Sequence, residues 1–205
     1  MINNYAALSL GLFLEIDAIS HSDKEDIDKQ VAIIAKLAGI DEQDVLELPL
    51  PAYAVLSADT DFLRHECPPA TAPSRLICGD LSLVPTKDFT QITTAQYVDF
   101  QTFSKGGVAA LPDLLSVLLI PEGHKYNDGY DLEAVKATVK ELPLPAALGL
   151  SAFFFERLVA SIQASLTSLE KAAKRASLTQ RAKMQAVLET ILRQVPGLGS
   201  SASTE

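Results

Sequence analysis

The chain has 205 residues, of which 48% are hydrophobic and 21% are charged, the composition of a globular protein with one large or two small domains. Its formal net charge of −9 argues against nucleic-acid binding through phosphate contacts, which needs a basic face. Leu and Ala are abundant and Trp is absent, a balance that favours helices over a sheet-rich sandwich.

The charge is unevenly distributed along the chain. Residues 1–100 hold 6 basic and 16 acidic side chains, whereas residues 101–205 hold 11 basic and 10 acidic ones. The acidic half is expected to keep the protein soluble. Six of the basic residues lie within residues 170–193, and this stretch is either a solvated helix face or a surface for an acidic partner.

The first 66 residues predict a small acidic helical unit. Ser22 and Glu25 match the capping box of a helix, S-x-x-E, and an apolar stripe at helical spacing follows them. Gly39 is expected to end that helix, and Asp41 is placed to cap the next one. A short helix or strand is expected before this pair, over residues 8–19, and a further helix after it, over residues 52–66.

A proline-rich stretch, CPPATAPS at residues 67–74, predicts a linker or long loop. Residues 75–84 then read as strand, turn and strand, with Gly79 and Asp80 at the turn. Cys67 and Cys78 are the only cysteines, and two free thiols in a reducing cytosol are the simplest interpretation.

From Thr93 onward the pattern becomes helical again. Thr93 and Gln96 match a capping box, T-x-x-Q, at the start of one helix. Residues 111–120 predict a second, apolar helix that Pro121 stops, and Asp131 is placed to cap a third. The turn-rich loop between the last two helices suits a tight turn with positive φ rather than a calcium loop, which needs oxygen donors that it lacks.

A long helix over residues 146–176 is the strongest single feature of the sequence. Its apolar stripe, at spacings of three and four, consists of Phe155, Leu158, Ile162, Leu166, Leu169, Ala173 and Ala176. A narrow stripe beside basic residues suits packing on a partner helix, and packing on residues 180–194 of the same chain is the alternative. The predicted protein-binding residues are Leu166, Leu169, Lys171, Ala173, Lys174 and Arg175.

The sequence therefore predicts a mainly α (α+β) fold, a helical bundle with a small antiparallel β-hairpin and a long C-terminal helix. The expected divisions are an acidic N-terminal helical unit (1–66), a Pro-rich linker (67–74), a hairpin plus helical domain (75–195) and a disordered tail (196–205). Residues 75–170 are expected to form one cooperative core that buries Tyr97, Phe100, Leu118, Phe153, Phe154, Phe155 and Leu158.

Residues with catalytic chemistry are scattered. His65 and Cys67 form the only close His/Cys pair, and the second pair that a zinc site needs is missing. A nucleophilic Cys–His pair has no flanking signature, and no phosphate-binding, dinucleotide-binding, serine-hydrolase or metalloprotease motif is present. No catalytic residue, metal or cofactor is therefore predicted, and the protein is expected not to be an enzyme.

The sequence also predicts no membrane segment and no secretory signal. Its longest apolar candidate, Leu142 to Phe155, contains Pro143 and Pro145, and Glu156 ends it short of a membrane span. The first five residues lack the basic region of a signal peptide.

Four segments give the chain a resemblance to a known family. They are VAIIAKLAGIDEQDVLELPLPAYAVL, ITTAQYVDFQTF, LLSVLLIPEGHKYNDGYDLEAV and FFFERL, in that order with a hairpin after the first. This arrangement resembles the tail assembly chaperones of tailed bacteriophages, especially those in phages and prophages of gut bacteria. The resemblance covers about residues 8–170 and consists of hydrophobic and turn residues rather than a catalytic signature.

The resemblance implies a function in the host cell cytoplasm. Proteins of that family bind the tape-measure protein during tail assembly, help to recruit tail-tube subunits and then leave. They are often made in short and frameshift-extended forms, and they offer no catalytic residues to carry over. A structural protein that stays in the virion, at the neck, connector or tail, remains an alternative, and so does an enzyme that uses Cys67 or His65. Whether the protein forms homo-oligomers stays open.

Overall fold

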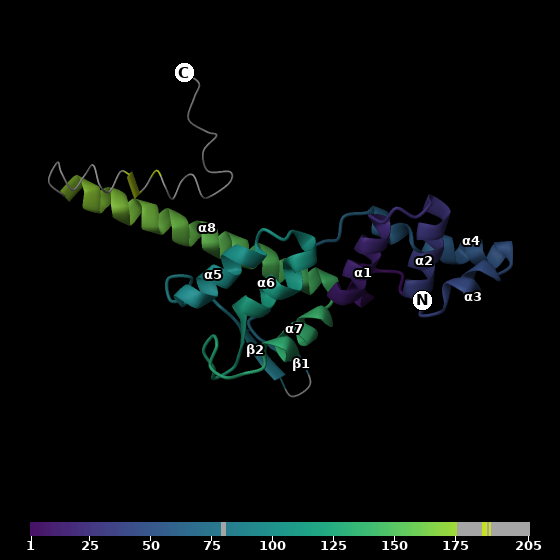
Figure 1. The fold of residues 1–205 in the computed structure, drawn as a ribbon, viewed down its shortest axis with the longest axis horizontal. Helices are drawn as coiled ribbons and strands as arrows, with labels where there is room; N and C mark the ends of the chain where they lie inside the picture. Colours follow the sequence, from purple (N-terminus) through teal and green to yellow (C-terminus); the bar gives the residue numbers. More distant parts are fainter. Residues whose placement is uncertain (79–80, 176–185, 188, 190–205) are drawn as a thin grey trace, which may run out of the picture. The chain divides into compact units, whose positions relative to one another are not determined.

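The computed structural model describes residues 1–78, 81–175, 186–187 and 189, and the side chains of these residues except 172–175 (Figure 1). The fold is mainly helical with a small antiparallel sheet and a long helix toward the C-terminus, as predicted. The chain divides into two compact units, Met1–Phe155 and Glu156–Glu205.

The N-terminal part of the first unit is a set of short helices (Figure 1). In chain order they are the 3₁₀ helix Tyr5–Ala7 (η1), α1 Leu10–Ser20, α2 Asp26–Ala38, α3 Glu42–Leu46, α4 Leu50–Asp59 and the 3₁₀ helix Asp61–Arg64 (η2). The single helix predicted over residues 52–66 is thus two elements. Thr60 separates them, and its Oγ1 donates a hydrogen bond to the Ser57 carbonyl at 2.7 Å.

Helix α2 ends as the sequence predicts but begins differently. Gly39 follows it in the left-handed conformation, with φ 68°, which a glycine adopts without steric cost. The predicted capping box is wrong, because Glu25 is the N-cap and makes no side-chain capping bond. The Ser22 hydroxyl instead donates a hydrogen bond to the Ile19 carbonyl at 2.6 Å, so Ser22 binds the last turn of α1 and does not cap α2.

The small antiparallel sheet contains the predicted hairpin and one further strand. Strands β1 (Leu76–Cys78) and β2 (Leu81–Pro85) pair antiparallel, and the predicted turn between them lies outside the described residues. Strand β3 (Leu119–Pro121) adds to the other edge of β2, with Leu83 opposite Pro121. The last two residues of the helix predicted over 111–120 therefore belong to a strand. A short apolar run has no periodicity by which a helix can be distinguished from a strand.

Three helices are close to these strands in the sequence. Helices α5 (Thr94–Phe103) and α6 (Leu111–Leu118, after the 3₁₀ turn Val108–Ala110) lie between β2 and β3, and α7 (Leu132–Lys140) follows β3. Thr93 caps α5 as predicted, because its Oγ1 accepts a hydrogen bond from the Gln96 backbone N–H at 3.1 Å. Gln96 does not complete the capping box. Its side chain is buried and donates to the Val117 carbonyl at 2.8 Å, which ties α5 to α6.

Helix α8 (Leu144–Arg175) begins two residues earlier than predicted, within the first unit. The backbone N–H of Leu144 donates to the Leu8 carbonyl, and the N–H of Leu10 donates to the Leu142 carbonyl, both at 2.8 Å. These bonds join the segment before α1 to the segment before α8. The predicted domain boundaries stay a prediction, but residues on either side of the Pro-rich segment are joined by backbone hydrogen bonds.

The Pro-rich segment has no regular secondary structure, and it lies against the first turns of α8. The N–H of Ala70 donates to the Pro145 carbonyl at 2.8 Å. Gly149 allows this approach, because a Cβ built there would lie 1.8 Å from the Ala70 carbonyl oxygen.

The predicted aromatic core is partly wrong. Phe100, Phe154 and Leu118 are buried, and Phe89 packs edge-to-face on Phe100 and Phe154 with ring centroids 6.0 and 6.4 Å apart. By contrast, Phe155 is 45% and Tyr97 is 46% exposed, while Phe153 and Leu158 are half-buried. Successive residues of a helix point about 100° apart, so three consecutive phenylalanines do not all face one core.

By length and composition alone, one helix among the described residues could cross a membrane, namely Leu144–Lys171 of α8. This helix is longer than the apolar run from Leu142 to Phe155 because it continues past the charged residues Glu156 and Arg157, and the absence of a membrane segment stays a prediction. The core helix of a soluble protein meets the same criteria, and α8 buries Leu144, Leu150 and Phe154 in the first unit.

Candidate protein-binding surfaces

The C-terminal part of α8 carries the apolar stripe that the sequence predicts. Leu158, Ile162, Leu166 and Leu169 follow one another at spacings of four, four and three residues, and all four are half-buried. The polar residues between them, such as Gln163 and Thr167, are exposed. The stripe is therefore one continuous face of the helix.

The six predicted binding residues all lie in α8. Leu166 and Leu169 lie on the half-buried stripe, and Lys171 is exposed. The side chains of Ala173, Lys174 and Arg175 lie outside the described part of the structure. Of the segment 180–194 proposed as an internal partner, only residues 186–187 and 189 are described. That alternative to an intermolecular contact stays open.

A second apolar surface, on α4, was missed by the sequence analysis. Leu50 is 78% and Val55 is 62% exposed, and Leu46, just before α4, is 63% exposed. The opposite side of α4 packs Tyr53 and Leu56 on the buried cluster of Val31, Ile34, Ala35 and Val45. The signal that could have revealed it is a short helix with apolar residues on more than one side, within an acidic stretch of sequence.

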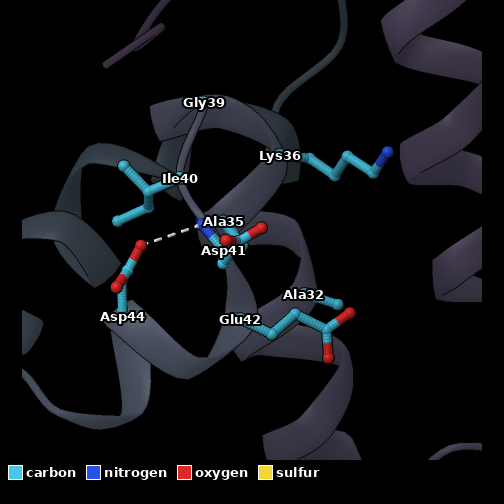
Figure 2. A pocket seen from close by; sticks show the side chains of 8 residues that line it. All are labelled: Ala32, Ala35, Lys36, Gly39, Ile40, Asp41, Glu42 and Asp44. Atoms are coloured by element: carbon cyan, nitrogen blue, oxygen red, sulfur yellow. Dashed lines mark hydrogen bonds between the residues drawn. The ribbon is translucent and has the colours of Figure 1, made fainter.

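A hollow lies between the end of α2 and α3, lined by Ala32, Ala35, Lys36, Gly39, Ile40, Asp41, Glu42 and Asp44 (Figure 2). Its charged groups have partners within the chain. The Lys36 side chain points away from the Asp41 and Asp44 carboxylates of the hollow (Figure 2). It pairs instead with Glu15 at 2.7 Å, and this carboxylate raises the pKa of the Lys36 ammonium. Glu42 pairs with Lys24 at 3.3 Å. Asp41 is the N-cap of α3, as predicted, and its backbone N–H donates to the Asp44 side chain at 3.3 Å.

A second hollow lies between β2, the start of α5 and the loop after β3, with Gln96 and Tyr126 in its lining. The Tyr126 hydroxyl donates to Asp99 at 2.6 Å, and burial together with this carboxylate raises the pKa of Tyr126. Asn127 and Gly129 have φ values of 61° and 75°, which confirms the predicted tight turn. The two buried polar side chains of this hollow, Gln96 and Tyr126, are both hydrogen-bonded within the chain, Gln96 to the Val117 carbonyl and Tyr126 to Asp99. Their polar groups therefore stabilise the loop.

The His65–Cys67 pair lacks the lowered thiol pKa of an activated nucleophile. Burial raises the pKa of the Cys67 thiol, whereas a nucleophilic cysteine needs a lowered one. The His65 ring lies 3.6 Å from a carboxylate oxygen of Asp61. Within the described part of the chain, no three His, Cys, Asp or Glu side chains are grouped to hold a metal ion.

Apolar helix faces are thus the most distinctive surfaces of the described residues, and the charged groups of the hollow between α2 and α3 have partners within the chain. The chain matches no family model, no curated protein and no solved structure.

Proposed function

We propose that this protein binds a helical protein client through the C-terminal part of α8 and keeps it soluble during assembly. The observation that carries the proposal is the stripe of Leu158, Ile162, Leu166 and Leu169, which continues beyond Phe155, the last residue of the first unit. An amphipathic helix with anchors at such spacing is a standard element for packing on another helix. Lys171, Lys174 and Arg175 follow the stripe in the sequence.

The client proposed from the sequence resemblance is the tape-measure protein of a phage tail, in the host cell cytoplasm. On this proposal the protein covers apolar helices of the client until tail-tube subunits replace it. Reversible covering needs a soluble exterior and a contact of moderate size, because large apolar interfaces are permanent. The net charge of −9 and the narrow stripe support that requirement.

The test is co-purification of the full chain with a co-expressed tape-measure protein. Charge reversal at Lys171, Lys174 and Arg175 is expected to weaken capture and to reduce its dependence on salt, because these charges attract an acidic partner. The matched control reverses Lys105, Lys125 and Lys140, which lie elsewhere on the surface and are exposed. Equal capture by both triple variants would show that the basic end of α8 has no part in binding.

The fate of the protein separates a chaperone from a structural virion protein. A chaperone is expected to be abundant in infected cells and absent from finished particles. Quantitative mass spectrometry of purified virions beside the cell lysate measures this directly. Stoichiometric copies in a symmetric multiple would reject the chaperone and favour a connector or tail component.

A further inference from the structure

Helix α4 has apolar side chains on both of its sides. At about 100° per residue, Leu50, Pro51, Ala54, Val55 and Ala58 share an arc of about 140°. All five are exposed, and we call them the outer face of α4. The remaining residues of the helix are half-buried, and the Ser57 hydroxyl accepts a hydrogen bond from the Gln30 side chain of α2 at 2.5 Å. The outer face is therefore not required for packing within the first unit.

An outward helix face without polar side chains is unusual, because surface helices normally turn charged residues to water. Helix α2, in the same unit, follows the normal pattern: Asp26 and Asp28 are exposed while Val31 and Ile34 are buried. This difference makes the outer face of α4 a candidate surface for association with another molecule.

Acidic residues border this face. Asp44 and Glu47 precede α4, and Asp59 and Asp61 lie at its end. Within the described residues, Asp44, Glu47 and Asp59 form no ion pair, and residues 1–66 contain 13 acidic and 4 basic side chains. A matching partner therefore combines an apolar helix stripe with basic flanks.

The chain itself carries an element with that chemistry. Residues 156–205 contain 7 basic and 4 acidic side chains, and their first turns hold the stripe from Leu158 to Leu169. We propose that the outer face of α4 binds the basic C-terminal arm, from residue 156 onward, of a second copy of this chain. This contact uses the same stripe as the proposed client, but it involves only one protein and is therefore tested without the client.

The expected contact is weak. Five small or medium apolar side chains and Leu46 form a patch well below the size of a standard protein interface, and paired charges at its border contribute mainly orientation and rate. Association in the range of about 10–100 μM, weaker at high salt, follows from this.

The test measures the mass of the full-length chain by sedimentation equilibrium over a range of concentrations at low and high salt. We expect concentration-dependent self-association that Leu50→Gln with Val55→Gln abolishes, with thermal stability retained because both side chains are exposed. The matched control is Ile77→Gln on β1, since Ile77 is 73% exposed and lies away from α4 in the sequence. A wild-type chain that stays monomeric at every concentration, or one whose association survives the α4 substitutions, overturns the proposal.

A charge swap identifies the two surfaces that meet. Glu47→Lys with Asp59→Lys makes the border of α4 basic, and Lys171→Glu with Lys174→Glu makes the arm acidic. Each double variant alone is expected to be monomeric, because border and arm then have the same sign of charge. Mixing the two is expected to restore association, since each basic surface meets an acidic one. Failure of the mixture to associate overturns the assignment of the arm.

Discussion

The two parts of α8 use the same helical spacing for different purposes. In the first part, Leu144, Ala147, Leu150 and Phe154 are all completely or almost completely buried in the first unit. In the second part, Leu158, Ile162, Leu166 and Leu169 continue the pattern but are only half-buried. An apolar stripe on a helix therefore does not by itself indicate a core, and the degree of burial distinguishes a folding surface from a surface available for association.

The largest effect is expected in the first part, from Phe154→Ala. Phe154 is 1% exposed and contacts Phe89 edge-to-face, so truncation removes buried apolar area and leaves a cavity. We expect a loss of about 3–5 kcal/mol in the free energy of unfolding. Denaturant titration followed by circular dichroism measures it, and a loss below about 1 kcal/mol would mean that the first part of α8 is not a core helix.

Gly149→Ala tests the contact between the first part of α8 and the Pro-rich segment. In an exposed helix this change stabilises by about 1 kcal/mol, because Gly is a poor helix former. Here the added Cβ meets the Ala70 carbonyl oxygen at 1.8 Å, so backbone must move and we expect a destabilisation of about 1–3 kcal/mol. Ala152→Gly, at an exposed position on the same helix, measures the propensity effect alone. A stabilised Gly149→Ala chain would show that the segment does not lie against α8.

Local signals predicted much of this fold. Thr93, Asp131 and Gly39 cap or end their helices through the hydrogen bonds or backbone angles that their residue types suggest. These features depend on a few neighbouring residues, so a sequence contains enough information to find them.

Features that depend on distant residues were missed. Strand β3 forms because β2, more than 30 residues earlier, offers a free edge, and Gln96 leaves its expected cap because the Val117 carbonyl lies within reach. The outer face of α4 was missed for a related reason. Sequence periodicity assigns apolar residues to the interior, whereas the core beside α4 has room for only one of its sides.

Phe155→Ala, next to the most sensitive position, is expected to have a small effect. The three phenylalanines have the same chemistry, but Phe155 is 45% exposed whereas Phe154 is 1% exposed. We expect Phe155→Ala to cost less than about 1 kcal/mol, against about 3–5 kcal/mol for its neighbour. Comparing the two variants in one denaturant series removes the effect of residue type, and equal losses would contradict the burial that separates them.

Leu166→Ala is expected to have the smallest effect on stability and a clear effect on binding. Leu166 is half-buried on the second part of α8, so its truncation is expected to cost about 1 kcal/mol or less. The matched control is Leu150→Ala, where the same change in a buried leucine is expected to cost about 2–5 kcal/mol. If the stripe binds a client, Leu166→Ala weakens capture about tenfold, since central apolar anchors contribute more than about 1 kcal/mol to an interface. Thermal unfolding of both variants beside client capture by Leu166→Ala separates the two uses of the helix. A large loss of stability with unchanged capture would place Leu166 in a core, and the stripe would then have no part in binding.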